Sequence, residues 1–69
     1  MMTRSRLTRA IEASGVRRER VAADAATTVQ HLRNLENGRN RPSLHMARRI
    51  AGALGVTVDE IFPARARTA

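Results

Sequence analysis

The sequence predicts an all-α domain of five short helices, on the basis of three observations. The 69-residue chain is long enough for one compact domain with one core. Glycine and proline interrupt it at short intervals, and the apolar residues between these interruptions recur at helical spacing. Residues that favour helix N-termini precede several segments. We expect one domain over residues 1–69, with its core at about 5–62 and a flexible tail at 64–69.

The first predicted helix covers about residues 4–14. Leu7 and Ile11 lie on one face at a spacing of four residues, which suits an amphipathic helix packed on a core. Thr3 or Ser5 is positioned to cap its start.

The second predicted helix runs from Arg18 to Ala25. Val21 and Ala22 lie on its inner face, and Glu19 falls in the first turn, where the helix dipole favours a carboxylate. A three-residue turn at 26–28 follows. Two short helices joined by so few residues must cross steeply, which leaves the next helix projecting from a small base.

The third predicted helix covers about Thr28–Glu36, with the Thr28 hydroxyl as its N-cap. Leu32 and Leu35 form a narrow inward stripe, so the side chains between them face outward. Asn37 and Gly38 end this helix.

The last two predicted helices have the clearest boundaries. Ser43 is a suitable cap for the fourth helix, and Gly55 is a suitable terminator. Four apolar residues of this helix recur at i, i+3, i+4 and i+7: Ala47, Ile50, Ala51 and Leu54. Thr57 and Glu60 form a capping box that opens a short fifth helix, which Pro63 stops.

The charge of the chain points to a polyanionic partner. Thirteen basic residues against six acidic ones give a net charge of +7. Every basic residue is an arginine, which together with many alanines is typical of a GC-rich genome. A basic helix lying on an anionic membrane is the main competing explanation, but such helices carry more apolar aromatic residues than Phe62 alone.

Several function classes are disfavoured by the residue inventory. The chain has no cysteine for a disulfide, a thiolate metal site or a nucleophile, so we expect no metal and no cofactor. His31 and His45 fall in different helices, and no paired carboxylates suggest a pocket, so we expect no enzyme. No apolar run approaches the roughly 20 residues of a membrane span, and we expect a cytoplasmic protein without membrane association.

The outward face of the third helix carries groups that read base edges. Gln30 and Asn34 lie four residues apart, and each amide can donate to and accept from adenine in one plane. Val29 offers an apolar contact to a thymine methyl group, and Arg33 can reach guanine or phosphate. A solvated helix face explains any one of these residues, but their combination favours DNA. The predicted base contacts are Val29, Gln30, His31, Arg33 and Asn34.

The chain resembles the Xre family, the repressor and Cro type of helix-turn-helix protein found in lambdoid phages and small bacterial regulators. The resemblance covers about residues 5–62 and rests on six segments: 18–22, 27–30, 35–38 (Leu-Glu-Asn-Gly), 41–44, 50–56 and 59–62. It implies a five-helix DNA-binding domain that is usually dimeric and binds two inverted half-sites. Arginines on either side of the third helix and the resemblance together predict these phosphate contacts: Arg17, Arg18, Thr28, Asn37, Arg39 and Arg41. Backbone N–H groups at the start of the second helix and around 37–38 are candidate additions.

Some residues depart from the family pattern. Ile11 stands where many relatives carry an arginine that pairs with the glutamate matching Glu36, and we expect Arg9 or Arg39 to replace it. Three further positions differ from the glycine, serine and glutamine that are common there: Ala26, Arg17 and Arg18.

These observations predict a sequence-specific transcriptional regulator, a repressor that binds double-stranded DNA as a homodimer. Apolar surface near the fifth helix is expected to form the dimer interface: Val56, Val58, Ile61 and Phe62. One alternative is an antitoxin that binds a toxin partner and represses its own operon. Another is a protein-interaction or membrane-surface module that retains the fold without reading sequence.

Overall fold

A computed structural model describes residues 5–63, and within this range the chain is all-helical, as predicted. The helices are α1 (Arg6–Ser14), α2 (Arg18–Asp24), α3 (Val29–Glu36), α4 (Leu44–Leu54) and α5 (Val58–Ile61). The alternative cap Thr3 and the predicted tail at 64–69 lie outside the described residues. The five predicted helices are therefore present in the predicted order.

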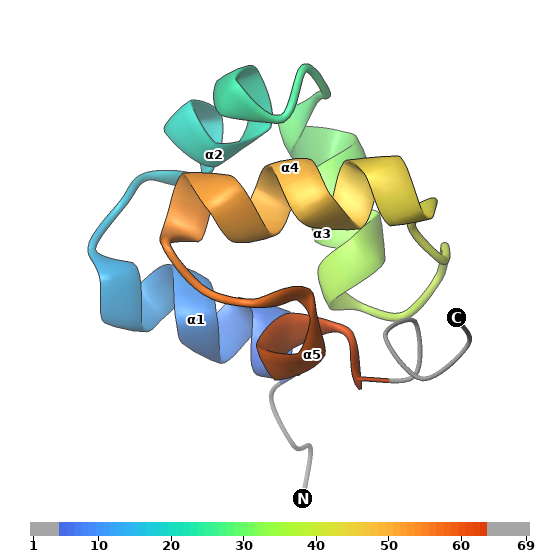
Figure 1. Cartoon of the computed structure of the whole chain (residues 1–69). Coiled ribbons are helices and arrows are strands. Elements are labelled where there is room, and N and C mark those ends of the chain that lie inside the picture. The colour runs from blue at the N-terminus through green and yellow to red at the C-terminus, as the bar shows by residue number, and fades with distance from the viewer. Residues whose placement is uncertain (1–4, 64–69) are drawn as a thin grey trace, which may run out of the picture.

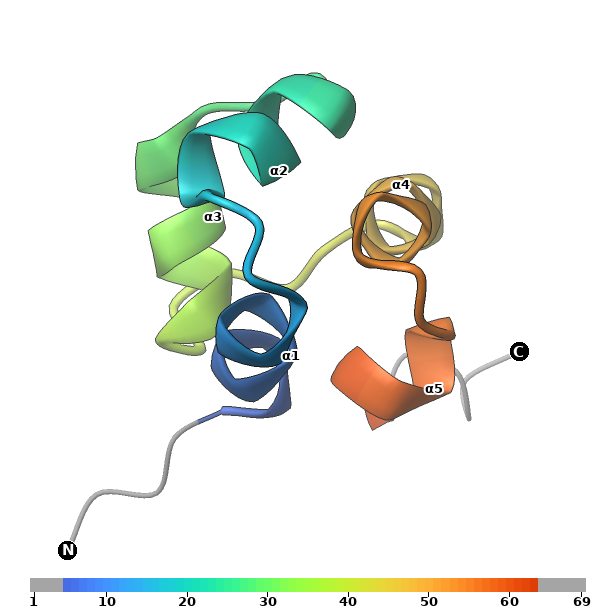
Figure 2. The same cartoon turned by 90° about the vertical axis from the view of Figure 1, so that its left-hand side faces the viewer.

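The five helices surround one core, with α3 and α4 on opposite sides (Figures 1 and 2). Helix α1 packs against α3, α4 and α5, while α2 packs against α3 and α4. In Figure 2, α1 and α2 flank α3, and α4 and α5 lie across the core from it. This arrangement holds α3 by its inner face and leaves its outer face uncovered.

The core consists of the apolar stripes that the sequence predicts. Each helix contributes at least one buried aliphatic side chain: Leu7, Ile11, Val21, Ala25, Leu32, Leu35, Ile50, Ala51, Leu54 and Ile61. Ile61 is only 4% exposed, because α5 packs against α1 and α4. Ile61 therefore has almost no surface to offer the predicted dimer interface, whereas Val56, Val58 and Phe62 are half-buried.

Side-chain caps fix the start of four helices. The hydroxyl of Ser5 accepts a hydrogen bond from the backbone N–H of Thr8 at 3.1 Å, which settles the choice between the two predicted caps. Thr28 and Ser43 cap α3 and α4 in the same way, each through an N–H three residues ahead. Thr57 and Glu60 form the predicted capping box of α5. Since each cap satisfies an N–H group that the helix cannot, these residues define where the helices begin.

The turn between α2 and α3 begins earlier than predicted, because α2 ends at Asp24. The N–H of Thr27 donates to the carbonyl oxygen of Ala22 at 2.8 Å, and the N–H of Ala26 donates to that of Ala23 at 3.1 Å. This pair of hydrogen bonds is a Schellman motif, which needs a left-handed residue at its centre. Ala26 takes that conformation with φ of 58°. The tight turn brings α3 directly against α2.

Candidate nucleic-acid interface

The outer face of α3 presents all five residues that the sequence predicts as base contacts. Leu32 and Leu35 are buried against the rest of the domain, which fixes the rotation of the helix about its axis. Gln30 and Arg33 are exposed, while the others retain part of their surface: Val29, His31 and Asn34. Gln30, Arg33 and Asn34 lie toward the middle of this face, whereas Val29 and His31 lie at its two opposite edges, about 160° apart around the helix axis.

Gln30 and Asn34 are joined by a hydrogen bond across one turn of α3. The Nε2 atom of Gln30 donates to Oδ1 of Asn34 at 3.2 Å. The bond fixes the orientation of both amides and leaves the Gln30 carbonyl oxygen and the Asn34 amino group for other partners. An acceptor and a donor side by side match the N6 and N7 positions of adenine.

Exposed arginines lie on both sides of this helix along the chain. Arg17 is the N-cap residue of α2, and Arg39 and Arg41 belong to the loop that follows α3. All three side chains are exposed, as are those of Thr28 and Asn37. A guanidinium group binds a phosphate oxygen pair through two parallel N–H bonds, so these positions suit the sugar-phosphate backbone beside an occupied groove.

The backbone N–H groups after α3 do not serve the same purpose. The N–H of Asn37 donates to the carbonyl oxygen of Arg33 at 2.9 Å, and that of Gly38 donates to Leu35 at 3.2 Å. The N–H of Arg39 donates to Asn34 at 2.9 Å. Because these three groups close the helix, the expected neutral phosphate contacts around 37–38 are wrong, and contacts there must come from side chains.

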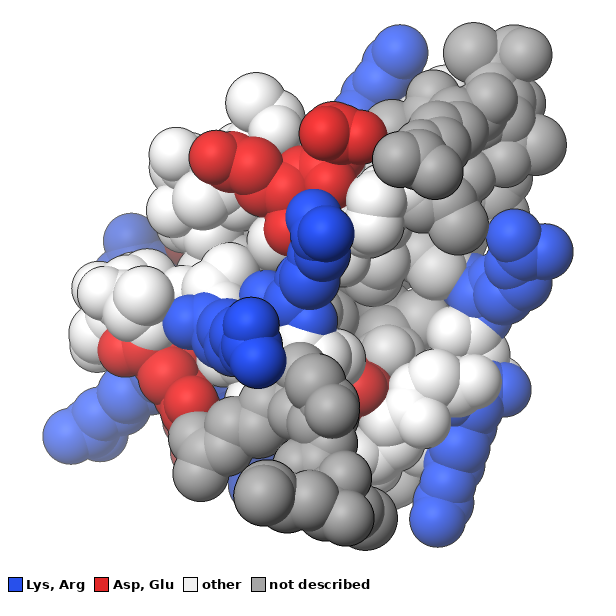
Figure 3. All heavy atoms as spheres, turned by 90° about the horizontal axis from the view of Figure 1, so that it is seen from below, with Lys and Arg blue, Asp and Glu red and all other residues white. Residues whose placement is uncertain are grey.

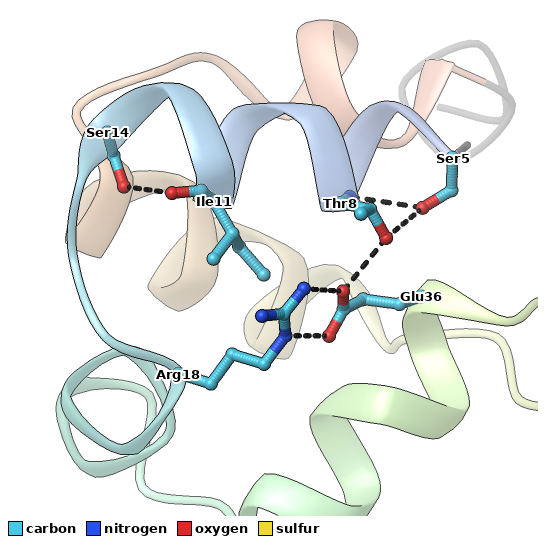
Figure 4. A network of polar contacts seen from close by, with 6 residues as sticks. All are labelled: Ser5, Thr8, Ile11, Ser14, Arg18 and Glu36. Atoms are coloured by element: carbon cyan, nitrogen blue, oxygen red, sulfur yellow. Dashed lines mark hydrogen bonds and ion pairs between the residues drawn. The ribbon is translucent and has the colours of Figure 1, made fainter.

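Glu36, the last residue of α3, is held by residues from α1 and α2 (Figure 4). Its carboxylate accepts two hydrogen bonds from Arg18, from Nε at 2.9 Å and from Nη2 at 2.8 Å. The hydroxyl of Thr8 donates to the same carboxylate at 2.8 Å, and the hydroxyl of Ser5 donates to that of Thr8 at 3.0 Å. The expectation that Arg9 or Arg39 would pair with Glu36 is therefore wrong.

Burial and hydrogen bonding act in opposite directions on this carboxyl group. Burial would by itself raise the pKa of Glu36, which is 9% exposed, but the hydrogen bonds from Arg18 and Thr8 and the charge of Arg18 outweigh it. The pKa of Glu36 is lowered as a result. The hydrogen bond to Glu36 in turn raises the pKa of Arg18. Both groups are therefore charged at neutral pH and form an ion pair.

A hollow of about 310 Å³ lies over this ion pair, where α1, α2 and α3 meet. Its lining is polar and includes both partners of the pair: Thr8, Glu12, Arg18, Arg33, Glu36 and Asn37. Arg33 adds to the positive potential at Glu36 from this side. The hollow is therefore lined both by the ion pair and by residues at the exposed end of α3.

Part of the positive charge lies beside acidic side chains or is engaged by neighbouring residues. On the face seen from below in Figure 3, acidic side chains lie beside arginines. Some arginines are engaged by partners within the described residues: Arg18 by Glu36, Arg20 by Asp24 at 3.2 Å, and Arg49 by His45 at 2.9 Å. Within residues 5–63, Arg17, Arg39 and Arg41, which flank α3 in sequence, form no ion pair with a carboxylate.

The fold and the exposed helix define a helix-turn-helix DNA-binding domain. A family model described as helix-turn-helix matches residues 4–61, and the chain belongs to this family, which is that of the Xre and lambda-repressor type. Members of the family are DNA-binding regulators, so DNA is a partner of this chain. No curated protein matches the sequence significantly. None of the helices within residues 5–63 is long and apolar enough to cross a bilayer.

Proposed function

We propose that this protein is a sequence-specific regulator that represses transcription by placing α3 in the major groove of operator DNA. The observation that carries the proposal is the outer face of α3, where Gln30 and Asn34 are hydrogen-bonded to each other. Exposed arginines precede and follow this helix in the sequence. Amides read adenine edges in the major groove, and arginines neutralise the phosphates that border it.

We further propose that a homodimer binds an inverted repeat. Two recognition helices in successive major grooves lie about 34 Å apart. One molecule measures 31 × 28 × 20 Å, so two copies side by side span this distance without a linker. Val56, Val58 and Phe62 supply half-buried apolar surface beside α5 for the contact. Sedimentation that gives a monomer both free and on the operator would contradict this part of the proposal.

Selection of bound sequences from a random pool of duplex DNA is the direct test. The proposal expects enrichment of one motif, arranged as two inverted half-sites about one helical turn apart. Equal affinity for selected and random DNA would contradict sequence reading and favour an interaction module. A small toxin that co-purifies with the chain would instead show the antitoxin role.

Alanine variants then separate base contacts from phosphate contacts. Gln30→Ala and Asn34→Ala are each expected to cost about 1–3 kcal/mol of binding to the selected site and to relax preference at one or two base pairs. Arg39→Ala and Arg41→Ala are expected to weaken binding to all sequences alike and to lower the salt slope by about 1 each.

The two amide variants also test the hydrogen bond between them. Because Gln30 orients Asn34, loss of either side chain disturbs both contacts, and the double variant is expected to cost less than the sum of the single losses. Similar effects of the amide and arginine variants on specificity would contradict the assignment of roles.

A further inference from the structure

We infer that Arg18 is a positioning residue that holds the recognition helix α3 in place through Glu36, and that it makes no phosphate contact of its own. The inference rests on the proposed function, because it concerns how α3 is presented to DNA. It replaces the phosphate contact that the sequence predicts for Arg18.

The geometry of the guanidinium group supports this role. Its Nε and Nη2 atoms both donate to the carboxylate of Glu36, so the edge best suited to a bidentate phosphate contact is already occupied. A phosphate placed beside Arg18 would also meet the negative charge of Glu36 at short range. The pair is close to neutral as a unit and contributes little to attraction of a polyanion.

The position of the pair in the fold shows what it holds. Glu36 ends α3, Arg18 begins α2, and Thr8, which also donates to Glu36, lies in the first turns of α1. The two side-chain partners of Glu36 come from the two helices that pack against α3. The network therefore ties the end of the recognition helix to both of its supports.

Because Glu36 is buried, its contact with α1 and α2 depends on the hydrogen bonds from its partners. The Glu36 side chain is 6% exposed, whereas 29% of the Arg18 side chain remains exposed. A buried carboxylate that loses its partner must be hydrated or protonated, and either response removes the tie and leaves the end of α3 free to move. Since Asn34 and Arg33 lie within one turn of Glu36, such a movement displaces side chains of the reading face.

Opposite signs of the expected effects distinguish a positioning role from a phosphate contact. Glu36→Gln removes a negative charge and frees Arg18. If Arg18 served phosphate, this variant would bind all DNA more tightly. If Arg18 positions α3, the variant loses affinity for the selected operator while its affinity for random DNA does not fall.

The test measures operator and random-DNA affinity for Arg18→Lys, Glu36→Gln and the double variant, at a temperature where circular dichroism shows each to be folded. Arg18→Lys keeps the charge but loses the two-bond geometry. We expect each single variant to lower the ratio of operator to random affinity by at least about fivefold, the lower limit of one well-formed base contact. The double variant is expected to lose no more than the worse single variant, because both remove the same tie.

Arg20→Lys is the matched control, because it makes the same exchange two residues later on α2, at an exposed arginine that pairs with Asp24 at 3.2 Å. It is expected to leave the affinity ratio within about twofold of the wild type, since an exposed ion pair within α2 contributes little and does not hold α3. If Glu36→Gln does not fold, the charge-neutral pair Arg18→Met/Glu36→Leu replaces a buried ion pair with apolar side chains, and the same loss of ratio is expected.

The inference is overturned if Glu36→Gln tightens binding to every duplex, or if Arg18→Lys leaves the affinity ratio unchanged. Failure of the proposed function has a different signature. In that case the wild type itself shows no preference for any selected sequence.

Discussion

Ala26 is strained in the turn between α2 and α3. Its φ of 58° is a left-handed conformation, and Gly38 and Gly55 take the same conformation with φ of 74° and 69° after α3 and α4. A residue with a Cβ atom loses about 1–2 kcal/mol there. Ala26→Gly is therefore expected to raise the free energy of unfolding by about 0.5–1 kcal/mol, as the removed strain exceeds the added chain entropy. Urea unfolding measures the change.

Ala23→Gly is the matched control for this prediction. Ala23 is also exposed, but it lies within α2, where a glycine costs about 1 kcal/mol. Ala26→Gly is thus expected to raise the free energy of unfolding, whereas Ala23→Gly is expected to lower it. Loss of stability in both variants would show that Ala26 is not strained in solution.

Residues with local roles could be predicted from the sequence, and residues with distant partners could not. The caps Thr28, Ser43 and Thr57 follow from which side chains can reach an N–H group three residues ahead. The partner of Glu36 depends on how three helices pack, since Arg18 and Thr8 lie 18 and 28 residues away in the chain. No spacing rule covers such a contact.

At the scale of the elements, the contact of α3 with α1 and α2 depends on pH through Glu36. Hydrogen bonds from Arg18 and Thr8 lower the pKa of this carboxyl group in the folded protein, despite its burial. A lowered pKa means that the charged form stabilises the fold above the ordinary value of 4.5. This stabilisation is lost as the pH falls through the pKa of the folded state.

Comparison of wild type with Glu36→Gln isolates this effect. At pH 7 the variant is expected to be about 1–3 kcal/mol less stable, as hydrogen bonds to a charged acceptor are lost. The difference is expected to shrink as the pH is lowered below 4.5, since protonated Glu36 no longer holds Arg18. Denaturant unfolding at several pH values measures it. Glu19→Gln, at an exposed carboxyl, controls for lost charge with an expected change within about 0.5 kcal/mol. A constant difference across the acid range would contradict the prediction.

The sequence predicts the boundaries of the helices to within about two residues, but it does not predict which face of a very short helix packs inward. α4 is bounded by Ser43 and Gly55, as the sequence indicates. α5 is correct in place, but its inward face was not predicted, and Ile61 lies in the core rather than at a surface. A four-residue helix is too short for apolar periodicity to show which side faces inward.

At the scale of the whole molecule, stability depends on a small core of aliphatic side chains. A chain of 69 residues is expected to have a total unfolding free energy of about 3–10 kcal/mol. Ile50 is fully buried on α4, at the centre of that core. Ile50→Ala leaves a cavity that its neighbours fill only in part, at a cost of about 2–5 kcal/mol. The variant is therefore expected to unfold at a much lower temperature and urea concentration than the wild type, as followed by helical circular dichroism.

Leu44→Ala provides the contrast within the same helix. Leu44 is 43% exposed, so its truncation removes little packing and is expected to change stability by less than about 1 kcal/mol. If a dimer forms, its free energy adds to that of the fold, and the thermal midpoint of Ile50→Ala is expected to rise with protein concentration. Operator DNA is expected to raise it further, because only the folded form binds. Equal stability of the two variants would contradict the placement of Ile50 in the core and, with it, the support that the core gives to α3.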